Sequence, residues 1–224
     1  MNRIYRVDTV IFDCDSTLSY LEGIDELAVR KGVYEQLAPL TEQAMQGQLK
    51  LDQVFKRRLE LTLPTQSDLK WLGERYIETL VDGARQVIES LQSAGKQVHV
   101  VSGGLQPAVL RLATSLGINP QNVHAVDIFF DPLGNYCGFD ERSPLSKSGG
   151  KKLVCAEIIS TGLNAVMIGD GITDLEARQE RVEVIGFGGV AIRHAVKSSV
   201  ADYIEERSLL PILDRILVNP KTSD

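Results

Sequence analysis

The residues best suited to chemistry in this chain are aspartates that follow apolar runs. Asp13 and Asp15 come directly after residues 7–12, and Asp170 lies in the run 169–174, Gly-Asp-Gly-Ile-Thr-Asp, after a later apolar segment. Carboxylates that converge repel one another, and a shared proton or a bound cation with a preference for hard oxygen ligands relieves the repulsion. We therefore predict a Mg²⁺ site held by Asp13 and Asp170.

A phosphate site is predicted beside these acids. Ser102 opens the segment Ser-Gly-Gly and precedes a helix whose first turn accommodates Pro107, so its hydroxyl, the following amides and the helix dipole suit a phosphoryl group. Lys151 follows residues 148–150, Ser-Gly-Gly, at another helix start and adds a full positive charge. Lys147 and Lys152 compete for this role, and the position directly after the two glycines favours Lys151.

An acid cluster, a metal and a phosphate cradle together indicate phosphoryl transfer. An aspartate can attack phosphorus and carry the group as an aspartyl-phosphate, which divides one difficult displacement into two easier ones. Asp13 is the candidate nucleophile. Asp15 points to the other side of an extended chain but can turn inward once the strand ends, and it is the candidate general acid and base.

The order of the predicted elements explains how these segments could meet. Residues 7–12 predict a buried parallel strand, and residues 21–80 show only helical periods. From residue 84 onward, helices alternate with the predicted strands 98–101, 122–126, 165–168 and 184–187. Residues 127–139 break this rhythm and predict a β-hairpin flap. In open α/β sheets ligands bind at the carboxyl ends of the strands, where the polar segments lie.

We therefore predict an α/β fold with a Rossmann-like, doubly wound parallel sheet. A small all-helical cap is inserted after the first strand, and the hairpin flap follows later in the chain. The expected domains are an α/β core of residues 1–19 and 83–224 and a helical cap of residues 20–82.

Composition excludes several classes of protein. A chain of 224 residues with 43% hydrophobic and 24% charged residues is not disordered, fibrous or stapled by disulfides. A net charge of −6 and a pI near 5.2 argue against nucleic acid and membrane lipid as partners. Three scattered cysteines and the lack of a long apolar window lead us to expect a soluble cytoplasmic protein. Its expected partner is a small-molecule phosphomonoester, and no particular oligomeric state is predicted.

The polar segments also carry a family resemblance. Residues 13–17 (Asp-Cys-Asp-Ser-Thr), 102–104, 148–151 and 169–174 resemble the four ordered motifs of the haloacid dehalogenase superfamily. Within it the chain is most similar to the phosphoserine phosphatases. The similarity extends beyond the motifs through residues 22–28, the predicted flap, residues 186–189 and residues 192–193, so it covers nearly the whole chain. The resemblance implies an α/β core with a helical cap and the hydrolysis of O-phospho-L-serine to L-serine and phosphate, the last step of L-serine biosynthesis.

The resemblance implies a role for each residue that matches a motif. Asp13 would be the nucleophile and a Mg²⁺ ligand, and Asp15 the general acid and base with its backbone carbonyl on the metal. Asp170 would be a further ligand, and Asp174 would support the metal through water. The residues expected to hold the phosphoryl oxygens are Ser102, Gly103 and Lys151. The residues expected to contact the serine part of the substrate are Glu22, Met45, Arg58 and Thr173.

Arg58 also has support from helical spacing. It shares one stripe of a predicted helix, at i, i+3, i+4 and i+7, with Leu51, Val54 and Phe55. A guanidinium on an apolar stripe is costly unless it meets a carboxylate, which an amino-acid substrate provides. Glu22 would then suit the substrate ammonium, whereas Met45 by its spacing alone is ordinary helix packing.

Several of these segments also have a purely structural interpretation. The two acids after the first strand could be turn residues, and residues 102–104 could form a tight strand-to-helix turn. Residues 173–176 (Thr-Asp-Leu-Glu) and the pair Ser19 and Glu22 match the capping-box pattern of a helix start. The three histidines lie apart in the sequence and receive no role. The ordered set of motifs favours function over these alternatives at the strand ends.

Two other functions stay open at this point. The same chemistry could act on phosphothreonine, phosphoethanolamine or a sugar phosphate, or deliver the phosphoryl group to an alcohol. A phosphate-responsive binding module could use the aspartyl chemistry to switch its affinity for a partner. The acid and base Asp15 counts against the module, because a switch benefits from a slow second step.

Overall fold

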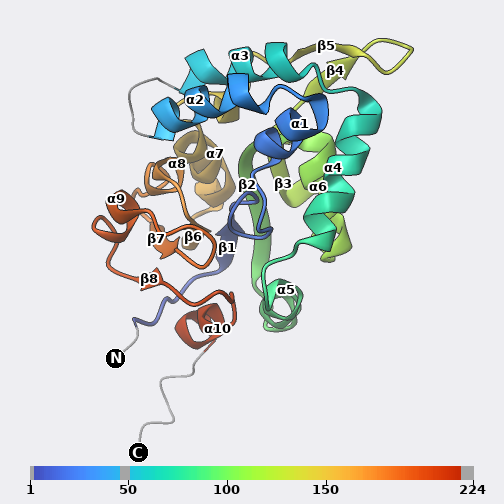
Figure 1. Cartoon of the computed structure of the whole chain (residues 1–224). Coiled ribbons are helices and arrows are strands. Elements are labelled where there is room, and N and C mark those ends of the chain that lie inside the picture. Colours follow the sequence, from blue (N-terminus) through green and yellow to red (C-terminus); the bar gives the residue numbers. More distant parts are fainter. Residues whose placement is uncertain (1–2, 46–50, 218–224) are drawn as a thin grey trace, which may run out of the picture.

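A six-stranded parallel sheet forms the centre of the molecule (Figure 1). The computed structural model describes residues 3–45 and 51–217. The strand order is β3-β2-β1-β6-β7-β8, and the order reverses between β1 and β6, where a ligand crevice is expected. The strands are β1 Thr9–Phe12, β2 Gln97–Leu105, β3 Val123–Val126, β6 Ala165–Gly169, β7 Val182–Phe187 and β8 Tyr203–Ile204.

Helices cover both faces of this sheet. The helices α5 (Ala84–Ser93) and α6 (Gln106–Ser115) lie on one side, and α7 (Gly150–Ile158) lies on the other, as right-handed crossovers require (Figure 1). The strands β1 and β6 are therefore buried on both faces, and all of their residues are buried. Shorter helices complete the core: α8 Ile172–Leu175, α9 His194–Lys197, α10 Pro211–Ile216, and the 3₁₀ turns Pro120–Asn122, Pro144–Ser146 and Ile159–Thr161.

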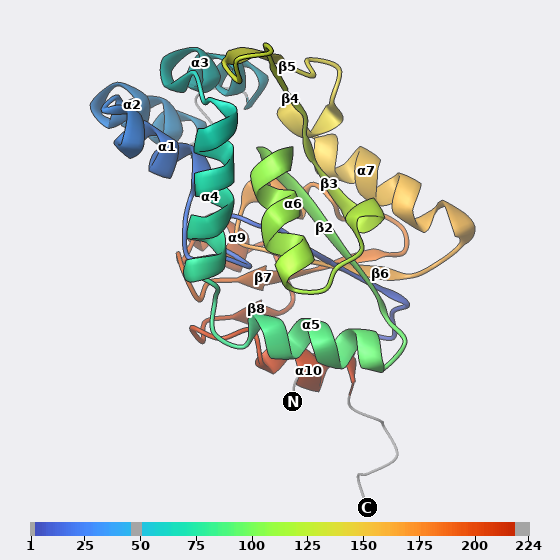
Figure 2. The ribbon, with the colours of Figure 1, turned by 90° about the vertical axis from the view of Figure 1, so that its right-hand side faces the viewer.

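Four helices are inserted between β1 and α5, and we call them the helical insertion: α1 Gly23–Lys31, α2 Tyr34–Met45, α3 Leu51–Thr62 and α4 Gln66–Glu78. Gly32 follows α1 in the left-handed region at φ 69°, a backbone conformation that glycine adopts without steric cost. The helix α4 runs beside α6 in both views (Figures 1 and 2). This contact holds the insertion against the core.

The predicted hairpin flap is present. It consists of β4 (Ile128–Phe130) and β5 (Tyr136–Phe139), which pair antiparallel. The ring of Phe139 lies 5.1 Å from the ring of Phe55 on α3, measured between centroids. The hairpin therefore packs against the helical insertion, and the predicted α/β fold with insertion and hairpin is confirmed.

Two strand predictions need correction. The strand predicted at 98–101 continues to Leu105, with an irregular ladder after Val101, so the Ser-Gly-Gly segment lies in the strand rather than after it. Glycines permit such a bulged, extended course. The strand β8 was not predicted, because two residues are too few to show an alternating pattern.

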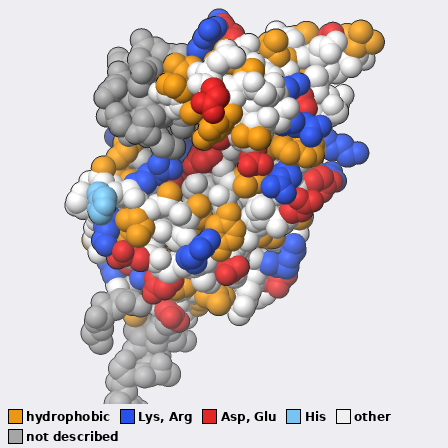
Figure 3. Space-filling view, in the orientation of Figure 1, with side chains coloured by type: hydrophobic (Ala, Val, Ile, Leu, Met, Phe, Trp, Pro, Cys, Tyr) orange, Lys and Arg blue, Asp and Glu red, His pale blue; other side chains and the backbone are white. Residues whose placement is uncertain are grey.

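The surface agrees with the composition. Within residues 3–45 and 51–217, no helix is long and apolar enough to cross a membrane. On the face drawn in Figure 3, Lys and Arg side chains are interspersed with Asp and Glu side chains.

Two histidines that are distant in sequence stack on neighbouring strands. His99 on β2 and His124 on β3 have parallel rings with centroids 5.6 Å apart, and His99 Nδ1 lies 3.4 Å from His124 Nε2. Burial lowers the pKa of both rings, and the neighbouring His124 helps to lower the pKa of His99 to about 4. Both rings are therefore neutral near pH 7.

The His99 pair predicts acid destabilisation between about pH 6.5 and pH 4. In this window His99 binds a proton in the unfolded chain but stays neutral in the folded protein. The free energy of unfolding therefore falls as the pH falls, by at most about 1.4 kcal/mol per pH unit for one proton. Urea unfolding at pH 7 and pH 5 should show a smaller loss for His99→Gln than for the natural chain. His194→Gln, at an exposed residue of α9, is the control. Equal losses in all three proteins would contradict the prediction.

Candidate active site

A cavity of about 400 Å³ opens at the carboxyl ends of β1, β2 and β6. It brings together most of the residues that the sequence singled out: Asp13, Asp15, Glu22, Arg58, Ser102, Gly103, Lys151, Asp170 and Thr173. Asp174 is fully buried next to Asp13 and Asp170. Met45 is the last residue of α2, and its side chain lies outside the described part of the chain.

A tight turn after β1 brings two aspartates into the cavity. Asp13 is the first residue after the strand, and its Oδ1 accepts a hydrogen bond from Cys14 N at 2.7 Å. Ser16 adopts a left-handed backbone at φ 50°, and its amide donates to Leu21 O at 3.0 Å. The turn reverses the chain so that Asp15 also faces the cavity.

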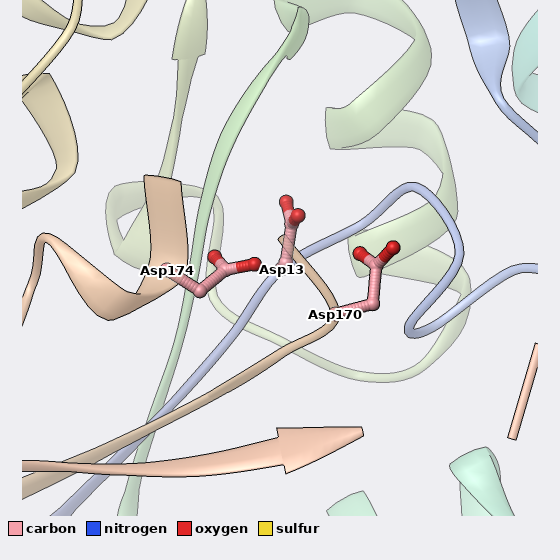
Figure 4. A group of neighbouring side chains, drawn as sticks. All are labelled: Asp13, Asp170 and Asp174. Atoms are coloured by element: carbon pink, nitrogen blue, oxygen red, sulfur yellow. The ribbon is translucent and has the colours of Figure 1, made fainter. Parts of the chain in front are cut away.

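Three carboxylates form a cluster beside this turn. One oxygen each of Asp13, Asp170 and Asp174 lies within 4.8 Å of the others, and all three residues are buried. Figure 4 shows Asp13 and Asp170 projecting from neighbouring strand ends, with Asp174 reaching toward Asp13 from the start of α8. An all-carboxylate donor set suits a hard cation such as Mg²⁺, so the cluster is consistent with a divalent metal site.

Burial makes this cluster costly. It raises the pKa of Asp170 well above its ordinary range, although Arg193 opposes the shift, and it raises the pKa of Asp174 to about 6 against the effect of Lys151. A cation in the cluster would favour the ionised form of both carboxyls. The site is therefore built to receive positive charge.

Lys151 supplies part of that charge. Its Nζ lies 2.8 Å from Asp13 Oδ2 and 2.7 Å from Asp174 Oδ1, and its side chain is 6% exposed. Burial alone would lower the pKa of Lys151, but the two carboxylates raise it above its ordinary value. Lys152 is exposed, and Lys147 is exposed at the cavity. Of the three candidate lysines, Lys151 is the one that pairs with the acids.

The Ser-Gly-Gly segment lines the same cavity. Ser102 is buried, and its Oγ accepts a hydrogen bond from Gly104 N at 3.0 Å. The helix α6 begins directly after it, at Gln106, with Pro107 in its first turn. Ser102 and the two glycines thus line the cavity together with Asp13 and Asp170, shortly before the start of α6.

Arg193 joins the core to the insertion, and sequence analysis gave it no role. It lies after β7, at the start of α9; its Nε donates to Asp170 Oδ2 at 2.7 Å and its Nη2 to Glu22 Oε1 at 3.2 Å. A signal was available, because this segment follows a strand end as the other polar segments do. An arginine alone, without a known partner, did not indicate which carboxylates it meets.

Asp15 has partners in the insertion that the sequence did not indicate. Its Oδ1 accepts hydrogen bonds from Tyr76 Oη at 2.6 Å and from Gly23 N at 2.7 Å. Burial raises the pKa of Asp15 to about 7, aided by the carboxylates of Glu22 and Asp13 and opposed by these two donors. In sequence, Tyr76 is one aromatic residue of an amphipathic helix, and nothing distinguishes it from a core residue.

Neither predicted capping box forms. Glu22 makes no side-chain cap to α1; its Oε1 accepts a hydrogen bond from Ser16 Oγ at 2.7 Å and the contact from Arg193. The helix α8 starts at Ile172 rather than after Thr173, and Gly171 N donates to Asp174 Oδ2 at 2.9 Å. Both interpretations relied on local spacing, whereas tertiary partners and an earlier helix start decided the outcome.

Arg58 reaches the cavity from α3. Val54 and Phe55 on the same stripe are buried, whereas Lys56 and Arg57 are exposed, as the helical spacing predicted. Arg58 Nε is buried and has no hydrogen-bond partner among the residues that the structure describes. Burial lowers the pKa of Arg58, and the carboxylates of Asp25, Glu22 and Asp15 oppose this shift. The guanidinium is thus held inside a cavity wall with donor capacity to spare.

Comparison with known proteins gives the family. A family model described as haloacid dehalogenase-like hydrolase matches residues 7–180. A phosphoserine phosphatase from Bos taurus is 37% identical over 208 residues, which cover 92% of this chain and 92% of the relative. The chain belongs to the phosphoserine phosphatase family of haloacid dehalogenase-like hydrolases.

Two solved structures of this family share the fold. One is a phospho-aspartyl intermediate analogue of a phosphoserine phosphatase, and the other is a substrate-bound phosphoserine phosphatase complex. Each is 30% identical to this chain with a TM-score of 0.79 and covers 95% of it; this chain covers 100% of the first and 99% of the second. The resemblance stated from the four motifs is confirmed.

The buried ion pairs predict a large stability loss for Lys151→Met. Removal of the ammonium leaves the carboxylates of Asp13 and Asp174 buried without their partner, which costs about 3–5 kcal/mol. Urea unfolding in the presence of a chelator measures this loss. Lys152→Met, at the exposed neighbouring position, should change stability by less than about 0.5 kcal/mol. Similar losses in the two variants would show that the buried pairs do not stabilise the fold.

Proposed function

We propose that this protein is a Mg²⁺-dependent phosphatase that hydrolyses O-phospho-L-serine to L-serine and phosphate, the last step of L-serine biosynthesis. The observation that carries the proposal is that one cavity is lined both by the strand-end acids Asp13, Asp15 and Asp170 and by Arg58 of the insertion. Membership of the phosphoserine phosphatase family supports the same substrate.

Asp13 and Asp15 divide the chemistry in this proposal. Asp13 attacks phosphorus and forms an aspartyl-phosphate, while Asp15 donates a proton to the departing serine oxygen. Asp15 then takes a proton from the water that attacks the aspartyl-phosphate, and phosphate leaves. A pKa of about 7 suits a carboxyl that must both give and accept a proton near neutral pH. The phospho-aspartyl analogue of a family member supports a covalent route.

The remaining proposed contacts hold charge. Asp13, Asp170 and the backbone carbonyl of Asp15 would hold Mg²⁺, with Asp174 acting through water, and the cation when bound would neutralise the charge that develops on the phosphoryl oxygens. Ser102, Gly103 and Lys151 would contact the same oxygens. Lys151 stays protonated because its carboxylate partners raise its pKa.

The insertion provides the proposed recognition of the amino acid. The Arg58 guanidinium, whose buried Nε has no hydrogen-bond partner among residues 3–45 and 51–217, suits the substrate carboxylate. The contacts of Glu22 with Ser16 and Arg193 use Oε1, which leaves Oε2 for the substrate ammonium. Thr173 lines the same cavity. Met45, whose side chain lies outside the described part of the chain, is the last of the proposed contacts.

We further propose that residues 20–82 act as a cap domain and that residues 1–19 and 83–224 form the core domain. The acids come from the core, and Arg58 and Glu22 come from the insertion, so the cavity is complete only with both in place. An enclosed cavity excludes bulk water during formation of the aspartyl-phosphate and admits one water afterwards.

Phosphate release from a substrate panel tests the proposal. With Mg²⁺ we expect a marked preference for O-phospho-L-serine over O-phospho-D-serine, phosphothreonine, phosphoethanolamine and sugar phosphates, and no activity with a chelator. Asp13→Asn should abolish turnover and leave the protein folded, because the amide keeps the shape of the side chain but cannot form the aspartyl-phosphate. Substantial activity in Asp13→Asn would exclude Asp13 as the nucleophile, and a preference for another phosphomonoester would exclude phosphoserine as the substrate.

Arg58→Met should separate substrate recognition from chemistry. Loss of the charged hydrogen bonds to the carboxylate should lower kcat/KM for phosphoserine about 10- to 100-fold, mainly through KM. Hydrolysis of phosphoethanolamine, which has no carboxylate, should change little. Arg57→Met is the control, because Arg57 is exposed on the same helix and pairs with Glu60. Equal losses on the two substrates would mean that Arg58 does not recognise the carboxylate.

A further inference from the structure

Both hydrogen-bond donors to Asp15 Oδ1 come from the helical insertion rather than from the sheet. Tyr76 Oη, on α4, lies 2.6 Å from Oδ1, and Gly23 N, at the start of α1, lies 2.7 Å from it. The Tyr76 side chain is 1% exposed and lines the cavity. The candidate acid and base is therefore oriented by residues that lie outside the element that carries it.

A glycine makes room for the tyrosine hydroxyl. A Cβ on Gly23 would lie 2.0 Å from Tyr76 Oη and 3.2 Å from Asp15 Oδ1, so any other residue would displace the hydroxyl. Gly23 thus donates one hydrogen bond to Oδ1 through its amide, and its lack of a side chain leaves room for the Tyr76 hydroxyl, which donates the other. The three groups fit together as a unit.

The two donors decide which oxygen of Asp15 can carry a proton. A carboxylate oxygen has two lone pairs, and at Oδ1 both are used to accept hydrogen bonds. A proton on Asp15 must then reside on Oδ2. This oxygen faces the Ser-Gly-Gly wall, since a Cβ on Gly104 would lie 3.3 Å from Oδ2 and 3.2 Å from Ser102 Oγ. The free oxygen points toward the segment that is proposed to hold the phosphoryl group.

We propose that Tyr76 is a positioning residue for the hydrolysis: its hydroxyl, together with Gly23 N, confines the exchangeable proton of Asp15 to Oδ2. In the first step Oδ2 gives this proton to the leaving serine oxygen, and in the second step the same oxygen takes a proton from the attacking water. The inference rests on the proposed acid and base role of Asp15. Since Tyr76 belongs to α4, the arrangement exists only while the insertion is docked on the core.

Tyr76→Phe tests this inference with a change of one oxygen atom. We expect kcat for phosphoserine to fall about tenfold or more, because general acid and base catalysis contributes about 10²- to 10⁴-fold and depends on orientation. KM should stay within about twofold, because Tyr76 is given no contact with substrate. Tyr20→Phe is the matched control: it removes a tyrosine hydroxyl that donates to Arg207 O at 3.0 Å, away from the cavity, and kcat should not change.

A double-mutant cycle separates positioning from ordinary packing. In an Asp15→Asn background, Tyr76→Phe should lower kcat no further, because the group that it orients is already lost. The losses of unfolding free energy in Tyr76→Phe and in Asp15→Ala should likewise not add up in the Asp15→Ala/Tyr76→Phe double variant. Additive losses of kcat and of unfolding free energy would overturn this inference and leave the proposed function standing. The same holds if Tyr76→Phe keeps the kcat of the natural chain while Asp15→Asn is inactive. A natural chain without phosphatase activity, or a fully active Asp15→Asn, overturns both.

Discussion

The ion pairs of Lys151 with Asp13 and Asp174 are the interaction on which the rest of the site depends. Asp13, Asp170 and Asp174 lie within one cluster, and burial of that much negative charge is tolerable only with compensation. Lys151 bridges two of the three carboxylates, and Arg193 pairs with the third. The remaining negative charge is what makes the cluster suitable for a divalent cation.

The register of the parallel strands brings these carboxylates close together. Phe12 of β1 pairs with Val100 of β2 and with Ile168 of β6, so the chain steps from the same level of the sheet into three functional segments. Asp13 follows Phe12 by one residue, and Ser102 and Asp170 follow their partners by two. Residues separated by about 150 positions in sequence are thereby held by rigid strands, which is the reason that parallel sheets place ligands at this edge.

The insertion contributes one side of the cavity at this edge of the sheet. It contributes Arg58, whose buried Nε has no partner in the described part of the chain, and two hydrogen-bond donors to Asp15. Arg193 ties the two parts together, because it contacts Asp170 of the core and Glu22 just before α1. The cavity therefore draws on groups from both the core and the insertion, whereas the acid cluster belongs to the core: Asp13 and Asp170 follow β1 and β6, and Asp174 lies on α8.

The sequence alone determined the strands other than β8 and the end of β2, the helical insertion, the hairpin and the segments that carry the acids, because hydrophobic period and strand-end polarity are local patterns. It also indicated the inward face of Arg58, since helical spacing sets that face. Tertiary structure decided which lysine meets the acids, that Glu22 turns toward Arg193 rather than capping a helix, and that Tyr76 reaches Asp15. These outcomes depend on partners that are distant in the chain, and the energy of a buried charge or hydroxyl is set by those partners rather than by its neighbours in sequence.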